Sequence, residues 1–321
     1  MGSGGSLLSF IGRRLLITIP LLLLISFGVF SLVLIIPGDP ALTLAGGTHS
    51  NPAEVARITN QLHLNEPFWR QYLRWLNEVI HGNLGNSLFQ HQSVASGIAE
   101  KFPVTLSLAV GGMLVAIIIG IPAGIISGVR QGTASDRLVT VGSSLGVAIP
   151  DFWLALLLVI VFAVNLRWLP ALGYVPYTTS VWGWFQHLIL PWLALGIGGA
   201  ATIARQVRGA LIDTLDQDYM RTALAKGLGN RAVIGKHALK NALSPAVTVI
   251  GISFGYLLGG TFIIEQIFSL PGIGQYMLQA ISVKDLPVIQ GVVLVTAVCF
   301  VIINLIVDIV YGYLNPKVRL A

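Results

Sequence analysis

Three carboxylic acids fall inside or at the ends of long apolar segments, where an ionisable side chain is costly and is a candidate for function. Asp151 follows a proline inside one segment, Glu265 stands at the end of another, and Asp308 lies near the end of a third. We expect Asp151 and Glu265 to line a polar pathway or to cap a broken helix. Asp308 is close enough to the basic carboxyl terminus to lie at a membrane interface. A proton relay needs a continuous chain of such groups, and three scattered carboxylates make a weak case for one.

Motifs for catalysis or nucleotide binding are absent from the sequence. The dipeptide Gly235-Lys236 lacks the upstream glycine of a phosphate-binding loop and is followed by histidine. The HExxH and CxxC patterns are also missing, the six histidines are scattered without ligand spacing, and Cys299 is the single cysteine. A membrane-embedded hydrolase would need a converging nucleophile and base, and no nucleophile-elbow motif supports one. We therefore predict no catalytic residue, no metal site and no cofactor bound by this chain.

The composition is that of a membrane protein. Of 321 residues, 55% are hydrophobic and only 10% are charged, and the mean hydropathy is +0.80. An ordinary soluble domain carries about 25% charged residues. This chain cannot cover a globular surface with solvated groups, which excludes a soluble enzyme, a disordered chain and a nucleic-acid-binding domain. The net charge of +6 is explained by basic loops on one side of a membrane.

Six apolar segments are long enough to cross a bilayer, and unpaired backbone is too costly in hydrocarbon for anything but helices. The predicted spans are 15–36, 103–129, 138–166, 188–204, 243–264 and 286–307, the third broken at Pro150-Asp151. Six spans place both termini on one side. That side carries 13 of the 19 Lys and Arg residues, which predicts a multi-pass protein of the cytoplasmic (inner) membrane with both termini cytoplasmic.

The segment 37–102, between the first two spans, is long and predicted to be external. Asn51-Pro52 resembles a helix start with proline at the first helical position. A second, amphipathic helix is predicted from Glu66 to Ile80, ended by Gly82. Its aromatic face suits a membrane interface, the top of the bundle, or a lid packed on its own protein.

The segment 213–242 is predicted to be a cytoplasmic loop with helices of its own. Asp216 or Asp218 can cap a short helix that ends near Gly227 or Gly229. A basic helix follows, and Ser244-Pro245 is expected to open the fifth span. Loops of this length are usually functional; a positively charged retention loop is the alternative.

Two apolar segments carry glycine at every fourth position, which makes a flat stripe along which another helix can approach closely. The two series are Gly120, Gly124 and Gly128, and Gly251, Gly255 and Gly259. We interpret these glycines as packing positions inside a tight bundle rather than as ligand contacts.

An ordered set of motifs along nearly the whole chain resembles the B-type permeases of dipeptide/oligopeptide ABC importers, in the binding-protein-dependent transport family. The matching segments are Pro37-Gly38-Asp39-Pro40, Gly82-Asn83-Leu84-Gly85-Asn86-Ser87, Trp168-Leu169-Pro170-Ala171 with Gly173-Tyr174, 218–227, 237–242, 265–274, and Asn304, Asp308 and Asn315-Pro316. Asn83 replaces the acid that is usual in its motif. Each motif alone is weak, and the ordered set is specific.

The resemblance implies an all-α polytopic membrane protein with six transmembrane helices and the type I ABC-importer permease fold. It divides the chain into a cytoplasmic terminus with the first span (1–36), an external segment (37–102), and a five-helix permease core (103–321) that includes the coupling loop 213–242.

In this family the cytoplasmic loop forms a coupling helix that docks in a cleft of an ATPase. The residues carried over are Asp218, Tyr219, Arg221, Thr222, Ala223, Ala225, Lys226 and Gly227. Arg221 occupies the glutamate position of the consensus, so a carboxylate contact with the ATPase is not carried over. Gly227 suits a docking turn that another backbone approaches closely.

A second segment is assigned to the outer gate of the pathway, because its Pro-Gly-x-Gly sequence breaks a helix where backbone would face a cavity. The candidate gate and pathway residues are Asp151, Glu265, Ile267, Phe268, Pro271, Gly272 and Gly274. A mere turn is the alternative interpretation of these glycines and this proline.

The elaborate cytoplasmic loop and the missing nucleotide site together predict an energy source on another chain. The resemblance implies a permease subunit that forms half of the pathway of an ATP-driven importer for di- and oligopeptides delivered by an external binding protein. Its partners would be a second homologous permease, two cytoplasmic ATPase subunits that bind ATP and Mg, that binding protein and the lipid bilayer, with no nucleic acid. Alternative cargoes are nickel complexes, glutathione or oligosaccharides. An ion-driven secondary transporter would need paired intramembrane carboxylates and internal repeats, and the sequence shows neither clearly.

Overall fold

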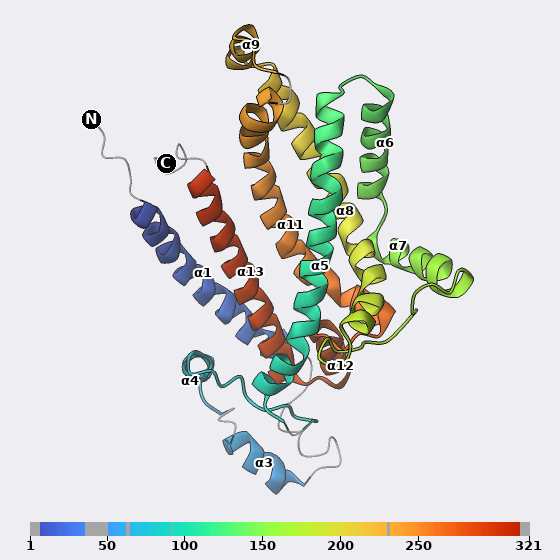
Figure 1. Ribbon diagram of the computed structural model, residues 1–321. Coiled ribbons are helices and arrows are strands. Elements are labelled where there is room, and N and C mark those ends of the chain that lie inside the picture. Colours follow the sequence, from blue (N-terminus) through green and yellow to red (C-terminus); the bar gives the residue numbers. More distant parts are fainter. Residues whose placement is uncertain (1–6, 36–50, 62–64, 91, 230–231, 315–321) are drawn as a thin grey trace. The chain divides into compact units, whose positions relative to one another are not determined.

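Long apolar helices make up most of the chain (Figure 1). The computed structural model describes residues 7–35, 51–61, 65–90, 92–229 and 232–314. Five described helices are long and apolar enough to cross a membrane, and a bent helix pair is a sixth if it is counted as one span. The five are α1 (Leu7–Ile35), α5 (Val94–Val129), α8 (Val181–Leu215), α11 (Leu239–Phe268) and α13 (Leu286–Leu314). The prediction of an all-α polytopic membrane protein is confirmed.

The bent pair consists of α6 (Ala134–Ala148) and the segment Asp151–Asn165, which begins with α7 (Asp151–Leu158), and the two are bent by 102°. Ile149 and Pro150 between them have extended backbone angles, with ψ of 121° and 138°. A proline disfavours helical angles in the residue before it and cannot donate the next helical hydrogen bond. The predicted break at Pro150-Asp151 is therefore where the chain turns, and α7 continues into the π-helix η2 (Val159–Asn165).

Several helices extend beyond the apolar segments that predicted them. Helix α5 begins at Val94 rather than at residue 103, and α8 begins at Val181, where the Ser180 hydroxyl accepts a hydrogen bond from Gly183 N at 3.0 Å. The apolar span itself runs Pro245–Phe268, which agrees with the predicted opening at Ser244-Pro245, but the helix that carries it begins earlier than predicted. The π-helix η3 (Val233–Ala238) runs directly into α11, so Pro245 lies inside a continuous helix and removes one of its backbone hydrogen bonds.

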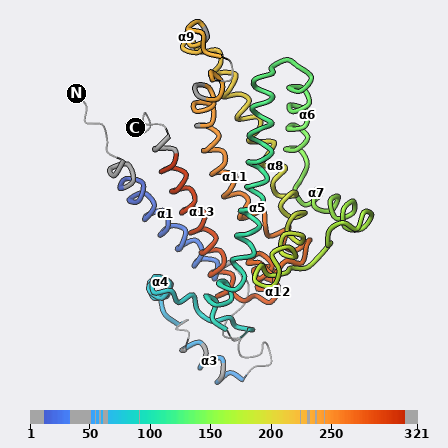
Figure 2. Tube along the Cα trace, in the orientation of Figure 1, coloured from blue at the N-terminus to red at the C-terminus, as the bar shows by residue number. Residues whose placement is uncertain are grey.

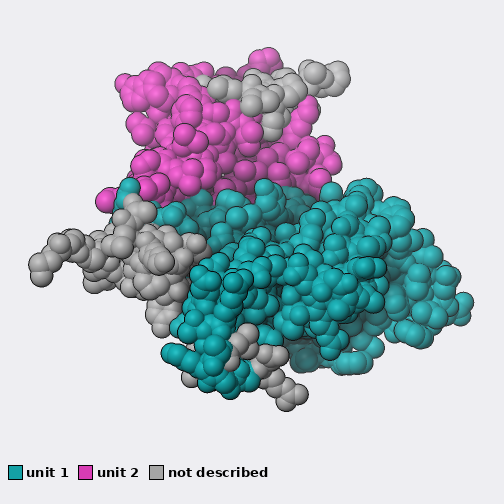
Figure 3. Space-filling view, turned by 90° about the horizontal axis from the view of Figure 1, so that it is seen from above, with its two compact units in different colours: residues 1–15, 103–275, 300–321 teal, residues 16–102, 276–299 magenta. Residues whose placement is uncertain are grey.

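The chain folds into two compact units (Figure 3). Unit 1 comprises residues 1–15, 103–275 and 300–321, and unit 2 comprises residues 16–102 and 276–299. Four shorter helices complete the fold: α3 (Pro52–Gln61), α4 (Phe68–Ile80), α9 (Asp218–Ala225) and α12 (Ile273–Val283). The motif segments at 37–40 and 315–316 lie outside the described residues.

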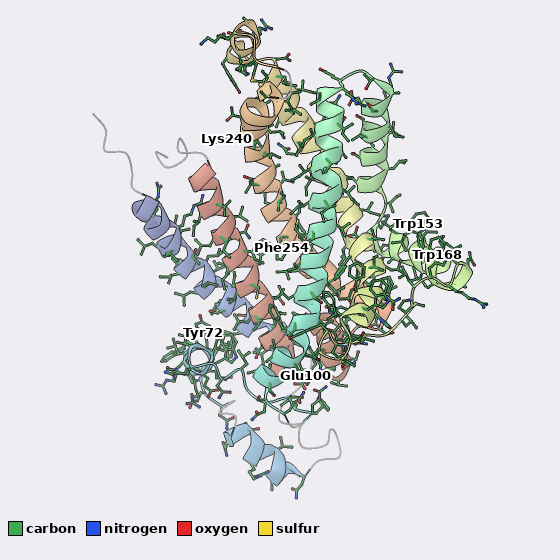
Figure 4. All side chains as sticks on the ribbon, viewed as in Figure 1. Tyr72, Glu100, Trp153, Trp168, Lys240 and Phe254 are labelled. Atoms are coloured by element: carbon green, nitrogen blue, oxygen red, sulfur yellow. The ribbon has the colours of Figure 1, made fainter. Side chains whose placement is uncertain are left out.

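In unit 2, helix α4 packs its aromatic face on α1. The Tyr72 ring (Figure 4) meets Phe27 edge-on at 5.3 Å, and the Phe30 ring lies 5.4 Å from Trp75. The Tyr72 hydroxyl also shares a hydrogen bond of 2.9 Å with Ser26 on α1. This arrangement supports a lid packed on its own protein, although Trp69 on another side of α4 is exposed.

Unit 2 also contains the resemblance motif at 82–87. The Ser87 hydroxyl donates to Asp285 Oδ2 at 2.5 Å, and the backbone N–H of Leu88 donates to Asp285 Oδ1 at 3.2 Å. Both Ser87 and Asp285 are buried. A buried carboxyl group needs such partners, so this pair fixes the motif to the turn between α12 and α13.

In unit 1, the first glycine series packs α5 against α8. A Cβ added at Gly120 or Gly124 would lie 2.7 Å from a backbone carbonyl oxygen of α8, and at Gly128 it would lie 3.1 Å from the Leu211 side chain. Only a residue without a side chain allows this approach. The indole N–H of Trp192 on α8 donates to the Ser107 carbonyl on α5 at 2.9 Å, so the contact extends along much of both helices.

The glycines of the second series differ in how closely another helix approaches them. Gly251 and Gly255 on α11 face Val307 and Phe300 on α13, where a Cβ would collide with the opposing side chain. A Cβ at Gly259 would meet nothing within 4 Å. Among the described residues, Gly259 is therefore not a packing position, because no neighbouring side chain or backbone approaches it closely.

Candidate functional site

Helix α9 follows the end of α8 (Figures 1 and 2), and several of its polar side chains are exposed. Asp218, Tyr219, Arg221 and Thr222 are exposed. Thr222 Oγ1 donates to the Asp218 carbonyl at 3.0 Å, which is a bond within the helix. The outward side chains are thus available to a partner, as the resemblance leads us to expect.

The inner face of α9 is fixed by one buried side chain. Met220 is 1% exposed and packs in a cluster with Leu211 of α8, Val233 and Ala238 of η3, and Ala242 of α11. Ala223 is partly buried against the same cluster. Burying a methionine side chain contributes roughly 2 kcal/mol. The α9 helix is therefore joined to the two long helices on either side of it.

The turn after α9 contains the glycine expected there. Gly227 has a φ of +81°, which side chains rarely adopt, and a Cβ at this position would meet nothing within 4 Å. Lys226 and Ala225 beside it are exposed. The need for glycine at 227 comes from the backbone conformation, and the space around it is open to another molecule.

A second site lies where the α5–α6 turn meets α8. Asp136 is 5% exposed, and its two carboxyl oxygens accept from Arg208 Nε at 2.6 Å and Arg208 Nη2 at 3.0 Å. Ser127 Oγ donates to the same carboxyl group at 2.5 Å and Gly132 N donates at 2.8 Å. A bidentate pair with two further donors satisfies a buried carboxylate fully. This cluster joins the α5–α6 turn to α8, and no motif in the sequence indicated it.

Replacing Arg208 with alanine is expected to destabilise the protein by about 2 kcal/mol, because it leaves the buried Asp136 carboxylate with its charge unpaired. Such a loss corresponds to a melting temperature lower by about 5 °C, measured for the purified protein in detergent.

Arg205→Ala is the matched control for this substitution. Arg205 lies one turn earlier on the same helix and is exposed, so its removal should leave the melting temperature within about 1 °C of the wild type. Equal melting temperatures for the two variants would show that the pair with Asp136 adds nothing to stability.

Glu265 lies at the centre of a buried corner at the end of α11. Its side chain is 0% exposed and accepts from Thr105 Oγ1 of α5 at 2.5 Å and from Gln275 N at 3.0 Å. Thr105 Oγ1 in turn accepts from the backbone N–H of Ile273 at 2.9 Å. The carboxyl group therefore ties the segment after α11 to α5, and it lines none of the described cavities.

The glycines of this segment allow close packing around Glu265. A Cβ at Gly272 would collide with the Glu265 carboxyl group, and a Cβ at Gly274 would lie 2.7 Å from Phe262 Cα. Helix α11 ends at Phe268, since Ser269 is left-handed with a φ of 53° and Leu270 N donates back to the Glu265 carbonyl at 2.8 Å. The segment is a folded corner rather than an open turn.

The remaining candidate gate residues occupy different positions in this corner. Phe268 is 1% exposed, Ile267 is partly buried and Pro271 is exposed. The Phe268 carbonyl accepts from Gly173 N at 2.9 Å, so two of the resemblance motifs meet here. Trp168 of the same loop (Figure 4) lies with its ring 5.9 Å from Phe162.

Asp151 lies apart from this corner, in a cavity of about 450 Å³ between α7, α8 and α11. A Cβ added at Gly198 would lie 3.2 Å from Asp151 Oδ1. Asp308, the third carboxylic acid, pairs with Arg14 Nη1 at 2.6 Å, and both side chains are partly exposed. The three acids therefore do not converge, which agrees with the weak case for a proton relay in the sequence analysis.

No cluster of three or more potential metal ligands occurs among the described residues. The polar groups that we find instead hold helix ends together or lie beside a cavity. The fold and these contacts define a multi-pass membrane protein.

Comparison with known proteins shows the family to which this chain belongs. The chain belongs to the family of binding-protein-dependent transport system inner membrane components, whose model matches residues 120–320. The amino-terminal part of the same family matches residues 7–109. The chain is therefore a membrane component of a multi-component transport system, located in the inner membrane.

Relatives and solved structures agree with this assignment. A dipeptide transport system permease of Alkalihalophilus pseudofirmus is 41% identical, covering 98% of this chain and 100% of that protein. A glutathione transport system permease of Escherichia coli O6:H1 is 39% identical, covering 98% and 99%. The fold matches an inward-facing structure of the methionine ABC transporter MetNI with a TM-score of 0.54 at 20% identity, covering 68% of this chain and 96% of that one. The predicted type I permease fold is confirmed.

Proposed function

We propose that this chain forms one half of the translocation pathway of an ATP-driven importer for di- and oligopeptides delivered by an external binding protein. The single observation that carries the proposal is the exposed α9 surface, held by Met220 to α8 and α11, in a chain without a nucleotide-binding motif. The peptide cargo is supported by the names of relatives about 40% identical over their full length. ATP and Mg would bind to two cytoplasmic ATPase subunits.

The second subunit of the pathway would be a homologous permease. Ile252, Tyr256 and Ile263 of α11 are 48%, 76% and 55% exposed and share one face of that helix. A helix with exposed apolar residues in a membrane protein faces lipid or another helix. We assign this face to the permease pair, with both termini cytoplasmic as the distribution of Lys and Arg favours.

The mechanism that we propose is alternating access. Closure of the two ATPase subunits on ATP draws α9 of this chain towards the corresponding helix of the second permease. The permease pair then changes from inward-open to outward-open. The corner at 265–274 forms part of the outer gate. Nucleotide binding can shift this equilibrium only because the ATPases bind one of the two states more tightly.

A pull-down in mild detergent with this chain tagged tests the proposal. We expect two ATPases and a related permease to co-purify, and the loaded binding protein to stimulate ATP hydrolysis and uptake of labelled dipeptide. Unlabelled glutathione should compete poorly. A stable chain without an ATPase partner would overturn the proposal, and strong competition by glutathione would change the cargo.

A further inference from the structure

The cavity beside α7 holds a carboxyl group whose charge is not compensated. Helices α7, α8 and α11 contact one another in unit 1 (Figure 1), and Asp151 at the start of α7 reaches the cavity between them. In the described part of the chain Asp151 makes no hydrogen bond or ion pair. None of the residues that line the cavity is basic. Every other membrane-segment carboxyl group described above has a partner.

The cavity has the size and the lining of a ligand site. Its volume of about 450 Å³ falls in the range of small-molecule pockets. Gly198, Gly199 and Gly260 contribute no side chains to its walls, and Thr202, Ser253 and Tyr256 contribute hydroxyl groups among aliphatic residues. Two of the lining residues, Ile252 and Tyr256, belong to the face of α11 that we assign to the second permease, so the cavity borders that face. Its surface is therefore mostly apolar, with one acid and a few hydroxyl groups.

An unpaired carboxylate in such surroundings favours a ligand with one positive charge. A charged group removed from water is costly until an opposite charge approaches it. The hydroxyl groups alone cannot supply that charge. The apolar walls accept side chains of different shape, because they make no directional contacts.

We infer that Asp151 is the binding site for the protonated amino terminus of the peptide in transit. This inference rests on the proposed function, since the cargo of a peptide importer carries an α-ammonium group at neutral pH. A single charged contact in an apolar cavity retains a peptide of any sequence and still lets it leave. Asp151 thereby selects for a free amino terminus, and the apolar walls do not discriminate between peptides with different side chains.

The test uses photo-crosslinking of the assembled permease complex without its binding protein, so that the selectivity of the binding protein does not enter. The probes are a dipeptide with a benzoylphenylalanine side chain and a free amino terminus, and its N-acetyl derivative. Labelling of the segments 195–202 and 249–260 is read by mass spectrometry. We expect the free-amine probe to label them at least about tenfold more than the acetylated probe at equal concentration.

The variants assign this preference to the carboxyl group. Asp151→Asn should reduce the ratio to within about twofold, while Asp151→Glu should keep most of it. Glu100→Gln removes an exposed carboxyl group elsewhere and should leave the ratio unchanged. Equal labelling by both probes in the wild type, or a ratio that persists in Asp151→Asn, would overturn the inference.

Three outcomes distinguish a failure of this inference from a failure of the proposed function. In the first outcome, the second permease no longer co-purifies with the Asp151→Asn variant, and the free-amine and N-acetyl probes label the wild-type complex equally. The carboxyl group then pairs with the second permease, and the inference is wrong. If the wild-type complex shows ATP-dependent peptide uptake without any preference at this cavity, the inference alone fails. Absence of uptake and of ATPase partners would remove the proposed function itself.

Discussion

Replacing Gly227 with valine is expected to abolish ATP-dependent uptake while the membrane helices stay folded. A β-branched residue at a φ of +81° is strained by about 1–3 kcal/mol. The turn after α9 would move, and the added methyl groups would enter the open space that we assign to the ATPase. We expect uptake in proteoliposomes to fall at least about tenfold, with ATP hydrolysis by the co-purified subunits continuing.

Gly229→Val provides the matched control. Gly229 is also exposed, also has open space around an added Cβ, and does not have the positive φ of Gly227. Gly227→Asn is a second control, since asparagine tolerates the left-handed region better than valine. If Gly229→Val lowers uptake as much as Gly227→Val does, the special backbone of the turn is irrelevant to coupling.

Replacing Glu265 with alanine is expected to destabilise unit 1 strongly. The substitution leaves the Thr105 hydroxyl and the Gln275 N–H without their buried acceptor, at a combined cost of about 3 kcal/mol or more. Thermal unfolding in detergent should show a melting temperature lower by roughly 6 °C or more. Glu265→Gln, which keeps one acceptor oxygen, should lose about half as much.

The neighbouring Gln266 offers the control for this prediction. It stands on the same last turn of α11 and is exposed, so Gln266→Ala should change the melting temperature by no more than about 1 °C. A normal melting temperature for Glu265→Ala would mean that the corner at 265–274 is held by its apolar contacts alone.

The sequence predicted the helices well and their ends poorly. Apolar length decides whether a segment can cross a bilayer, and in the described residues all six segments are helical, the third with its break at Ile149-Pro150. Helix ends depend on caps and on polar continuation, neither of which hydropathy detects. Pro245 illustrates the limit, because its usual place in the first turn predicted a start that the preceding π-helix removed.

The candidate sites also differ in how far the sequence could predict them. Local signals found α9 and Gly227, since a short helix, its cap and its terminal glycine are adjacent in the chain. The partners of Glu265 and Asp136 could not be predicted, because Thr105 is 160 residues from Glu265 and Arg208 is 72 residues from Asp136. An acid in an apolar segment was the available signal for Glu265. Asp136 lies between Arg130 and Arg137, and no motif singled it out.

The glycine contacts between α5 and α8 have a mechanical consequence. Helix α8 has 35 residues and is therefore roughly 50 Å long. Two helices in backbone contact over much of their length bend less readily than one helix alone, because bending would require the opposing backbones to slide. We therefore expect the pair to move as one rod, with α9 at the end of α8. A small rotation of α9 would then displace the far end of the α5–α8 pair, while the contacts between the two helices stay unchanged.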